Sequence, residues 1–505
     1  YIDCAQSGSV ITMSWFSLTD FDFVTHLQQA KNRGVDVRFL INSHATKSGS
    51  TSYQAWSALK GILGTSPADN ARNGSEYVGG PSGSWAMYCD SGCLTPPAKA
   101  GVVFPDDSEG EYPALHSKFF MISNINGSTV VGVASSNPTR AQAVNGWNNA
   151  QIYVTKKGKN DLFDNFNGYF AKLAAQGCTA SGCSGAAKAA SYAKLAAVGE
   201  TSFTTFPHPG GGPTTDDMAV TLQTMLNTKA CVYKDAKGKT QHSQIYVNMF
   251  VFTRNTVAMK LWQLASNPIA KGGGCNVHII YTDMDQAMKN FSGAWLNRSN
   301  GNPSWGSLDC ISTPTTTKGK FKALTVTTRT PLLDEFGKVV RDAKGKKRYT
   351  TAQLCSRGIL QGRLPTINMP GGYCWLNSKS KVSGGSIDAC VSTPLTITGD
   401  DPADNRTKLE AVRDANTAVL KYSHQKYVLI QTWNKAKSTP VYTTYSGTPN
   451  VTQPGLRWND EIMVTSTSGD IYAQYLANYN TMKKWINGRA GSGASLTPCK
   501  YYTTC

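Results

Sequence analysis

Two copies of the pattern His-x-Lys stand out in a chain that holds only seven histidines. His116 precedes Lys118, and His424 precedes Lys426, and each pair stands at the start of an apolar run. Side chains two residues apart on a strand point to the same side. Each motif therefore presents an imidazole and an ammonium group together.

An asparagine follows each motif at the end of a further predicted strand, at Asn137 and Asn450. Phosphodiester cleavage needs a nucleophile, an acid for the leaving oxygen, and donors or cations for the non-bridging oxygens. Two imidazoles can divide the first two tasks, and two lysines and two amides can bind the phosphate. A single His-x-Lys pattern means little, but two matching sets favour phosphodiester chemistry.

The motifs occupy matching places in an internal repeat. The first copy begins with a predicted strand at 10–17, a helix, and a second strand at 35–41. The second copy has the same order, with strands at 244–253 and 276–282. In both copies the strand at the motif follows, and an aromatic-rich amphipathic helix closes the copy.

This alternation predicts an α/β protein made of two similar βαβ-type halves, each with a mainly parallel sheet covered by helices. We expect a pseudo-twofold axis to relate the halves. The first half is predicted to span residues 1–200 and the second residues 215–505. The second half carries an insertion at about 286–405, between its second strand and its motif.

Thirteen cysteines are many for a protein of a reducing compartment. Several stand close together without the second pair that a zinc site requires, so disulfides and a secreted, extracellular protein are expected. Because the number is odd, Cys4 is predicted to be the unpaired thiol. The close pairs are Cys89/Cys93, Cys178/Cys183, Cys374/Cys390 and Cys499/Cys505.

The net charge of +18 favours polyanionic partners: nucleic acid, an anionic lipid surface or a phosphate-bearing substrate. The charge does not choose among them. No run of eighteen apolar residues is present, so no transmembrane segment is predicted. The chain opens without a methionine, which we interpret as a mature or trimmed start. No metal or cofactor is expected, and we expect a monomer.

With these motifs the chain resembles the phospholipase D superfamily, above all its secreted bacterial members, over nearly its whole length. That superfamily carries two His-x-Lys-x4-Asp motifs, each with a trailing Gly/Ser-x-Asn and then an Asn-x-Glu. Asn459 and Glu461 match the second Asn-x-Glu, and Asn149 and Gln151 stand at the first. Two positions depart from the pattern, because Ser123 and Gln431 replace the motif aspartates.

The resemblance implies the phospholipase D fold and a double displacement without metal. His116 is expected to attack phosphorus and form a phosphohistidine, and His424 to act as the general acid and base. The other site residues fall into two expected groups. Those expected to bind the phosphate are Lys118, Lys426, Asn137, Asn450, Ser135 and Ser446; those expected to orient the histidines are Glu461, Gln151, Asn149 and Asn459.

Three functions remain open. The first is hydrolysis of phospholipid head groups at a membrane or micelle surface, with transfer of the phosphatidyl group to alcohols. The second is a secreted nuclease of the same superfamily, and the third is a non-catalytic binding protein that kept the fold. A lidded pocket built by the insertion favours lipid, as do four aromatic residues near the motifs. These are Trp147, Trp433, Tyr445 and Trp458.

Overall fold

The computed structural model describes residues 1–64, 83–95, 113–208, 214–283 and 422–486, with interruptions at 157, 159–160, 180–181, 184–191, 236, 253 and 435–438. Between residues 284 and 421 it describes only separate strands and short turns. Most of the predicted insertion at about 286–405, together with Cys499 and Cys505, therefore lies outside the described residues.

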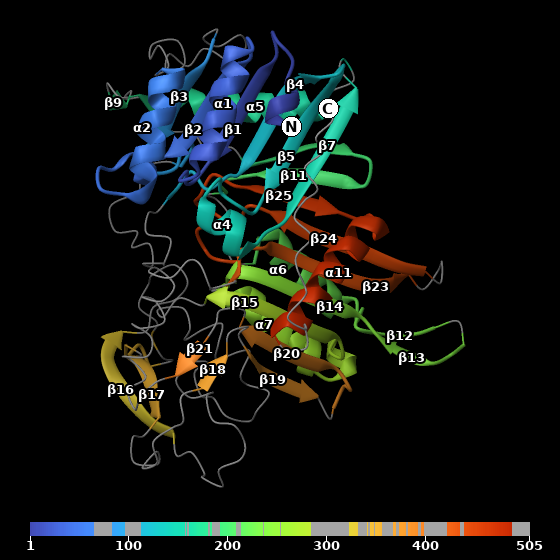
Figure 1. Ribbon diagram of the computed structural model, residues 1–505. Coiled ribbons are helices and arrows are strands. Elements are labelled where there is room, and N and C mark those ends of the chain that lie inside the picture. The colour runs from blue at the N-terminus through green and yellow to red at the C-terminus, as the bar shows by residue number, and fades with distance from the viewer. Residues whose placement is uncertain are drawn as a thin grey trace.

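Two large sheets, one above the other in Figure 1, form the body of the molecule. The first has eight strands in the order β7-β5-β4-β1-β2-β3-β8-β9. Its strands are β1 (Val10–Trp15), β2 (Asp36–Asn42), β3 (Trp85–Cys89), β4 (Phe119–Ile125), β5 (Ser128–Ala134), β7 (Ala150–Lys156), β8 (Cys178–Thr179) and β9 (Gly182–Cys183).

The second sheet has nine strands in the order β10-β11-β25-β24-β23-β14-β15-β20-β19. Its strands are β10 (Ala193–Val198), β11 (Thr201–Thr205), β14 (Gln244–Val251), β15 (Asn276–Asp283), β19 (Tyr373–Lys379), β20 (Ser386–Val391), β23 (Lys426–Asn434), β24 (Thr439–Gly447) and β25 (Ile462–Ser466). The run β25-β24-β23-β14-β15-β20 repeats the run β7-β5-β4-β1-β2-β3 of the first sheet. The α/β class and the two similar halves are thus confirmed.

The sheets are mixed, whereas alternation of strands and helices led us to expect mainly parallel pairing. Strands joined by a helical crossover are parallel, as in β1-β2 and β14-β15. Strands joined by a tight turn are antiparallel, as in β4-β5, where Asn126 and Gly127 both have positive φ. An Asn-Gly turn of this kind closes a two-residue hairpin. The motif strands β4 and β23 also run antiparallel to β1 and β14.

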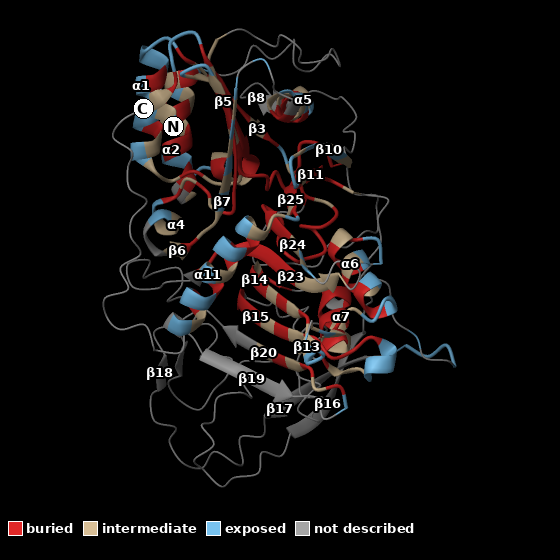
Figure 2. Cartoon of the chain, turned by 90° about the vertical axis from the view of Figure 1, so that its right-hand side faces the viewer, coloured by how far each residue is buried: buried red, intermediate tan, exposed pale blue. Residues whose placement is uncertain are grey.

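Helices cover both faces of each sheet, as Figure 2 shows. In the first half α1 and α2 pack on one face and α5 on the other; in the second half α6 and α7 lie opposite α11. The helices are α1 (Phe21–Asn32), α2 (Thr51–Leu63), α4 (Arg140–Asn145), α5 (Asp161–Ala175), α6 (Asp217–Asn227), α7 (Asn255–Ser266) and α11 (Gly469–Ile486), with 3-10 turns η1 (Ile2–Cys4), η2 (Ser43–Thr46) and η3 (Ile269–Lys271).

Short strands complete the fold. Two of them, β6 and β22, pair in parallel across the two halves. The set comprises β6 (Gly146–Trp147), β12 (Val232–Lys234), β13 (Thr240–His242), β16 (Ala323–Pro331), β17 (Tyr349–Cys355), β18 (Ile367–Met369), β21 (Leu395–Ile397) and β22 (Tyr422–Ser423).

The hydrophobic cores of the two halves are interlocked. Phe203 of β11 and Ile462 and Val464 of β25 pack into the core that α5 forms with the first sheet. In return, Trp147 of the first half packs beneath α11 against the second sheet. β11 and β25 belong to the second sheet, and Figure 1 shows them on the side of that sheet that faces the first. Since β10 and β11 pair within the second sheet, the chain joins that sheet from residue 193 onward; the boundaries 1–200 and 215–505 stay predictions.

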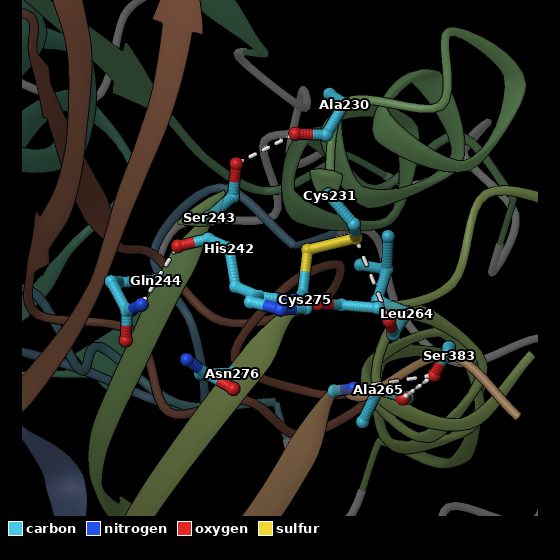
Figure 3. The surroundings of a disulfide bond; sticks show 12 residues. Ala230, Cys231, His242, Ser243, Gln244, Leu264, Ala265, Cys275, Asn276 and Ser383 are labelled. Atoms are coloured by element: carbon cyan, nitrogen blue, oxygen red, sulfur yellow. Dashed lines mark hydrogen bonds between the residues drawn. A yellow bond between two sulfur atoms is a disulfide. The ribbon is translucent and has the colours of Figure 1, made fainter. Parts of the chain in front are cut away.

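Disulfides are present, and one predicted pair is confirmed. Cys89 and Cys93 are bonded with their Cα atoms 5.0 Å apart. A second bond, between Cys231 and Cys275, joins cysteines 44 positions apart and was not anticipated (Figure 3). Cys4 is disulfide-bonded, so the prediction that it is the free thiol is wrong.

Two further predicted pairs face each other across antiparallel strands. Cys178 lies opposite Cys183 in the β8-β9 pair, and Cys374 lies opposite Cys390 in the β19-β20 pair. Within the described part of the chain, no helix is long and apolar enough to cross a membrane.

Phe203→Ala should lower the free energy of unfolding by about 3–5 kcal/mol, because the fully buried ring packs against Tyr153 and Phe166 where the two cores meet. Urea denaturation followed by far-ultraviolet circular dichroism measures the change. Val441→Ala, on an exposed position of β24, is the control and should stay within about 0.5 kcal/mol of the parent. A Phe203→Ala loss as small as that of the control would contradict the interlocked core.

Candidate active site

Both His-x-Lys motifs lie where an antiparallel strand begins beside the carboxyl end of a parallel one. Lys118 directly precedes β4, and Lys426 opens β23. The first residues after the two lysines pair with the equivalent positions of β1 and β14, Ser14 with Phe119 and Asn248 with Tyr427. Polar side chains at the carboxyl ends of parallel strands commonly build the binding crevice of an α/β sheet.

Backbone hydrogen bonds hold each motif against the opposite half. The His116 N–H donates to the Asp460 carbonyl over 3.1 Å, and the His424 N–H donates to the Trp147 carbonyl over 2.9 Å. The bonds are reciprocal, because each half supplies the carbonyl that the other half's histidine needs. The two motifs are thereby brought to a common place between the sheets, and both imidazoles are almost fully buried.

His116 is held by a carboxylate from the other half. Its Nδ1 lies 2.6 Å from Glu461 Oε1, and both side chains are buried. An ionised carboxylate only accepts, so whenever Glu461 is ionised the proton of this contact lies on His116 Nδ1. Burial raises the pKa of Glu461 to about 7, with the Lys118 ammonium acting in the opposite direction.

Glu461 is itself held in place from two sides. Thr448 Oγ1 donates to Glu461 Oε2 over 2.5 Å. Asn459 Nδ2 lies 3.3 Å from Oε1 and donates to it. The carboxylate therefore has one orientation, in which Oε1 faces His116. Asn459, which we expected to orient the histidines, acts on this carboxylate in the structure.

His424 sits close to several cationic and polar groups. Lys426 Nζ lies 3.3 Å from its Nε2, and Gln142 Nε2 lies 3.4 Å from the same nitrogen. Burial, followed by the charges of Lys426, Lys118 and His116, holds the pKa of His424 well below its ordinary value, and a hydrogen bond to the Ser135 backbone acts in the opposite direction. The two histidines are thus chemically unequal.

The structural counterpart of Glu461 is Asn148, and the expected pairing with Gln151 is wrong. Ser135 and Asn149 exchange backbone and hydroxyl bonds of 2.8 and 2.9 Å, and Thr448 and Ile462 exchange equivalent bonds of 3.0 and 2.9 Å. The residue just before Asn149 is Asn148, and the residue just before Ile462 is Glu461. An amide therefore stands in the first half where the second half has its carboxylate.

Three residues expected at the site lie instead in a polar cluster between the halves. Gln151 Nε2 donates to Ser446 Oγ over 2.7 Å and to the Tyr475 hydroxyl over 3.2 Å. Asn149 also contacts the Tyr475 hydroxyl, and its Oδ1 accepts from the Lys426 backbone N–H over 3.2 Å. Gln151 and Ser446 thus bind each other rather than a histidine, while Asn149 positions the second motif through its backbone.

Asn137 and Asn450 are equivalent in space as well as in sequence. Asn137 Oδ1 accepts from the Ser17 N–H over 3.2 Å, and Asn450 Oδ1 accepts from the Val251 N–H over 3.3 Å. Both bonds lie just at the ends of the parallel strands β1 and β14. Because the carbonyl oxygen of each amide is engaged in this way, its Nδ2 donors are directed away from the strand end.

Two phenylalanines at equivalent positions were missed by the sequence interpretation. The Phe16 ring centroid lies 5.2 Å from that of His116, and Lys118 Nζ lies 5.6 Å from the same ring. Phe250 has the same relation to His424 and Lys426, at 4.5 and 5.0 Å. An aromatic at the same register of both repeated strands was the signal that could have identified them.

The sequence interpretation also left His44 without a role. Its ring stacks on Phe16 at a centroid distance of 4.2 Å. Burial, with smaller effects from Lys47 and Lys118, lowers the pKa of His44 to about 4, so this imidazole is neutral at physiological pH. Phe16 and His44 form a stacked aromatic pair beside the first motif.

The positions of the missing motif aspartates lie away from the histidines. Ser123 stands five residues beyond Lys118 on β4, about 16 Å along an extended strand. Its Oγ accepts from the Val10 N–H over 2.8 Å at the start of β1. Gln431 is paired with Gln244 at the start of β14. The Ser123 hydroxyl therefore stabilises the pairing of β1 and β4. The imidazoles, ammonium groups and amides of the site do not depend on it.

The four aromatic residues that favoured a lipid substrate lie in different settings, and Trp458 is partly exposed. Trp147 and Tyr445 are buried in the cores, and Trp433 stacks on Tyr233 at the far end of β23 from the motif. Among the described residues, no group of three or more His, Cys, Asp or Glu side chains is arranged to hold a metal ion.

Comparison with known proteins finds a family model for residues 1–174, described as cardiolipin synthase, PLD-like domain. Comparison with curated protein sequences finds no match. Among solved structures, the chain is similar to a phospholipase D family member, Nuc, from Salmonella typhimurium, with 20% identity, 35% of this chain and 84% of that chain covered, and a TM-score of 0.23.

Two further solved structures are similar over most of the chain. Phosphatidylserine synthase from Haemophilus influenzae has 10% identity, 96% and 82% coverage of the two chains, and a TM-score of 0.36. Yeast tyrosyl-DNA phosphodiesterase has 8% identity, 92% and 84% coverage, and a TM-score of 0.33. The assignment to a superfamily therefore depends on the family model and the paired motifs.

Ser123→Ala should reduce the free energy of unfolding by about 1–2 kcal/mol and leave turnover unchanged, because it removes only the acceptor of the Val10 N–H. Urea denaturation measures the first quantity and an activity assay the second. Ser123→Asp restores an acceptor and is the matched control. A large fall in turnover with unchanged stability would contradict the structural role.

Sulfate should bind the site with uptake of up to about one proton near pH 6.5, because an anion between the motifs raises the depressed pKa of His424. Affinity should then decrease as pH rises from 5.5 to 8. Calorimetry in buffers of different ionisation enthalpy measures the uptake. His424→Gln, which cannot take up this proton, should bind sulfate with less uptake; equal uptake in both proteins would contradict the prediction.

Proposed function

We propose that this chain, a member of the phospholipase D superfamily, is a secreted phosphodiesterase that hydrolyses phospholipid head groups and transfers the phosphatidyl group to alcohols. One observation carries the proposal: two matching sets of imidazole, ammonium and amide lie at one buried place, joined by reciprocal backbone bonds. No other cluster in the described chain combines these groups. Because one chain supplies both sets, the site needs no second subunit, in line with the expected monomer.

His116 is the proposed nucleophile. The Glu461 carboxylate binds its Nδ1 proton, so the Nε2 lone pair is available to attack phosphorus. The attack forms the P–N bond and breaks the bond from phosphorus to the head-group oxygen. The Glu461 carboxylate also stabilises the positive charge that develops on the imidazole.

His424 is the proposed general acid and base. The substrate phosphate raises its depressed pKa, so substrate binding itself loads the proton that the leaving alcohol requires. After the alcohol departs, neutral His424 removes a proton from water or a second alcohol. That oxygen attacks phosphorus, the P–N bond breaks, and His116 is regenerated.

The two lysines and two asparagines supply the electrostatic part of the mechanism. Lys118 and Lys426 are almost fully buried, and an ammonium group removed from water gains strongly from an anion. The Nδ2 donors of Asn137 and Asn450 complete a set that stabilises negative charge on the non-bridging oxygens.

Two observations support a lipid substrate. The family model that matches residues 1–174 is that of a cardiolipin synthase domain. In addition, His116 and His424 are only 1% and 3% exposed, which suits a head-group phosphodiester better than an internal phosphate of a duplex. The disulfides Cys89–Cys93 and Cys231–Cys275 support secretion, since disulfides persist in oxidising compartments.

A secreted nuclease is the second candidate, and the aromatic pair beside the first motif favours it. Phe16 and His44 stack at 4.2 Å next to His116, as they would to extend a column of bases. The net charge of +18 would draw a nucleic acid strand as well as an anionic membrane.

The enzyme should release head groups from phosphatidylcholine or phosphatidylglycerol micelles, and added ethanol should yield the phosphatidyl ester. His116→Ala should reduce turnover about 10³-fold or more. The parent, quenched during turnover, should carry a phosphohistidine at His116 by mass spectrometry. His26→Ala is the matched control, because this half-exposed histidine of α1 binds Asp3 of η1 and its loss should leave activity unchanged.

Single-stranded DNA and RNA form the second arm of the same assay. Degradation of nucleic acid that His116→Ala lacks, without lipid turnover, would replace the proposal by the nuclease. An adduct on His424 would reverse the assigned roles. Binding of sulfate without turnover of any substrate would leave a binding protein with this fold.

A further inference from the structure

Asp460, which stands next to the Glu461 carboxylate, has a buried side chain bound by a loop of the other half. Its two oxygens accept from the backbone N–H groups of Cys93 and Leu94, over 2.5 and 3.1 Å. The side chain has no solvent exposure. A buried carboxylate is tolerated only when such bonds replace its hydration, so the position of Asp460 depends on that loop.

A disulfide shapes the loop. Cys89 is the last residue of β3, and its bond to Cys93 closes a ring of five residues. Ser91 has a φ of 59°, which turns the chain sharply within the ring. A Cβ on Gly92 would lie 2.5 Å from Thr95 Oγ1 and 3.3 Å from Asp460 Oδ2, so the carboxylate approaches the backbone closely here. The closed ring presents two successive amides to one anion.

The same stretch of the second half is fastened to the first at several points. The Asp460 N–H donates to the Ala114 carbonyl over 2.9 Å, and the Asp460 carbonyl accepts from His116 over 3.1 Å. Asn459 Oδ1 accepts from the Ala114 N–H over 3.0 Å. Thr95 Oγ1 donates to the carbonyl of Trp458. Residues 458–461 are thus held between the disulfide loop and the segment that carries the first motif.

The consequence falls on the neighbouring residue. Glu461 reaches His116 Nδ1 over 2.6 Å, and Glu461 is joined to Asp460 by one peptide bond. A displacement of about 1 Å in a reacting group can reduce turnover on the order of 10²-fold. Loosening Asp460 therefore acts on the nucleophile even though Asp460 does not touch its imidazole.

We propose that Asp460 and the Cys89–Cys93 loop are a positioning device for the Glu461–His116 pair, so that turnover requires this disulfide. The inference rests on the proposed function for its activity readout alone. The geometry of His116 can be followed without any substrate.

The experiment compares two disulfides in the same chain. Cys231–Cys275 is the matched control, because its cysteines are also fully buried and its Cα atoms are 4.5 Å apart, against 5.0 Å for Cys89–Cys93. It joins the stretch before β12 to the start of β15, at the opposite end of the β14–β15 pair from the second motif. Three proteins are made: Asp460→Asn, Cys89→Ser/Cys93→Ser, and Cys231→Ser/Cys275→Ser.

The first two variants should lose about 10²-fold in kcat, with KM changed less than about threefold. The control should keep its kcat at 25 °C, whatever it loses in thermal stability. Nitrogen-15 NMR of labelled histidine should show His116 as the Nδ1–H form in the parent and the control, and as a mixture of ring forms in the first two variants. The NMR arm distinguishes failure of this inference from failure of the proposed activity.

Three results would overturn the inference: an unchanged His116 signal in Asp460→Asn, retained kcat in the Cys89→Ser/Cys93→Ser protein, or equal losses in all three proteins. Thr95→Val provides a milder variant should the double cysteine variant fail to fold. It removes only the bond to the Trp458 carbonyl and should lower kcat about three- to tenfold. Wild-type kcat in folded Thr95→Val together with wild-type His116 signals would equally reject the device.

Discussion

The contact between the His116 imidazole and the Glu461 carboxylate joins residues 345 positions apart and depends on the arrangement of both halves. It forms only if β25 packs against the core of the first half and if residues 458–461 lie alongside the segment before β4. The interlocked cores, with Phe203 and Val464 packed under α5 and Trp147 under α11, bring about that arrangement. The packing of the two halves thus determines whether His116 and Glu461, which are far apart in the sequence, come into contact.

The second constraint is electrostatic. Two lysines and two histidines are buried together, and the Glu461 carboxylate contacts His116. Such an arrangement lowers the pKa of His424 and raises the affinity for any anion that fits. Because the protein, rather than water, surrounds these charges, the site is organised before the substrate arrives. Burial of the cations lowers the stability of the unliganded protein, and an anion that pairs with them offsets this cost.

Much of this arrangement could be predicted from the sequence. The repeat placed His116 with His424 and Asn137 with Asn450, because strands of the same register return equivalent residues to equivalent places. The departure of Ser123 and Gln431 from the motif could not be interpreted from the sequence. Only the sheet shows that these positions lie at the far ends of β4 and β23.

Other features were out of reach for physical reasons. The Asn-x-Glu pattern of Asn459 and Glu461 was matched to Asn149 and Gln151, so Glu461 was paired three residues away from its structural counterpart, Asn148. The hydrogen bonds between Ser135 and Asn149 and between Thr448 and Ile462 identify the equivalent positions, and this register cannot be read from the sequence. Cys231 and Cys275 are 44 positions apart in the sequence. They meet only because the residues before β12 and before β15 are neighbours in space. Whether two paired strands run parallel or antiparallel depended on whether a helix or a tight turn joins them.

The late position of Glu461 has a consequence for biosynthesis. A ribosome releases both His-x-Lys motifs before it reaches residues 458–464, which supply the carboxylate, the carbonyl for His116 and part of the core beneath α5. Until those residues emerge, His116 has neither its partner nor its place. The His116–Glu461 contact therefore forms only after residue 461 has been synthesised, later than both motifs.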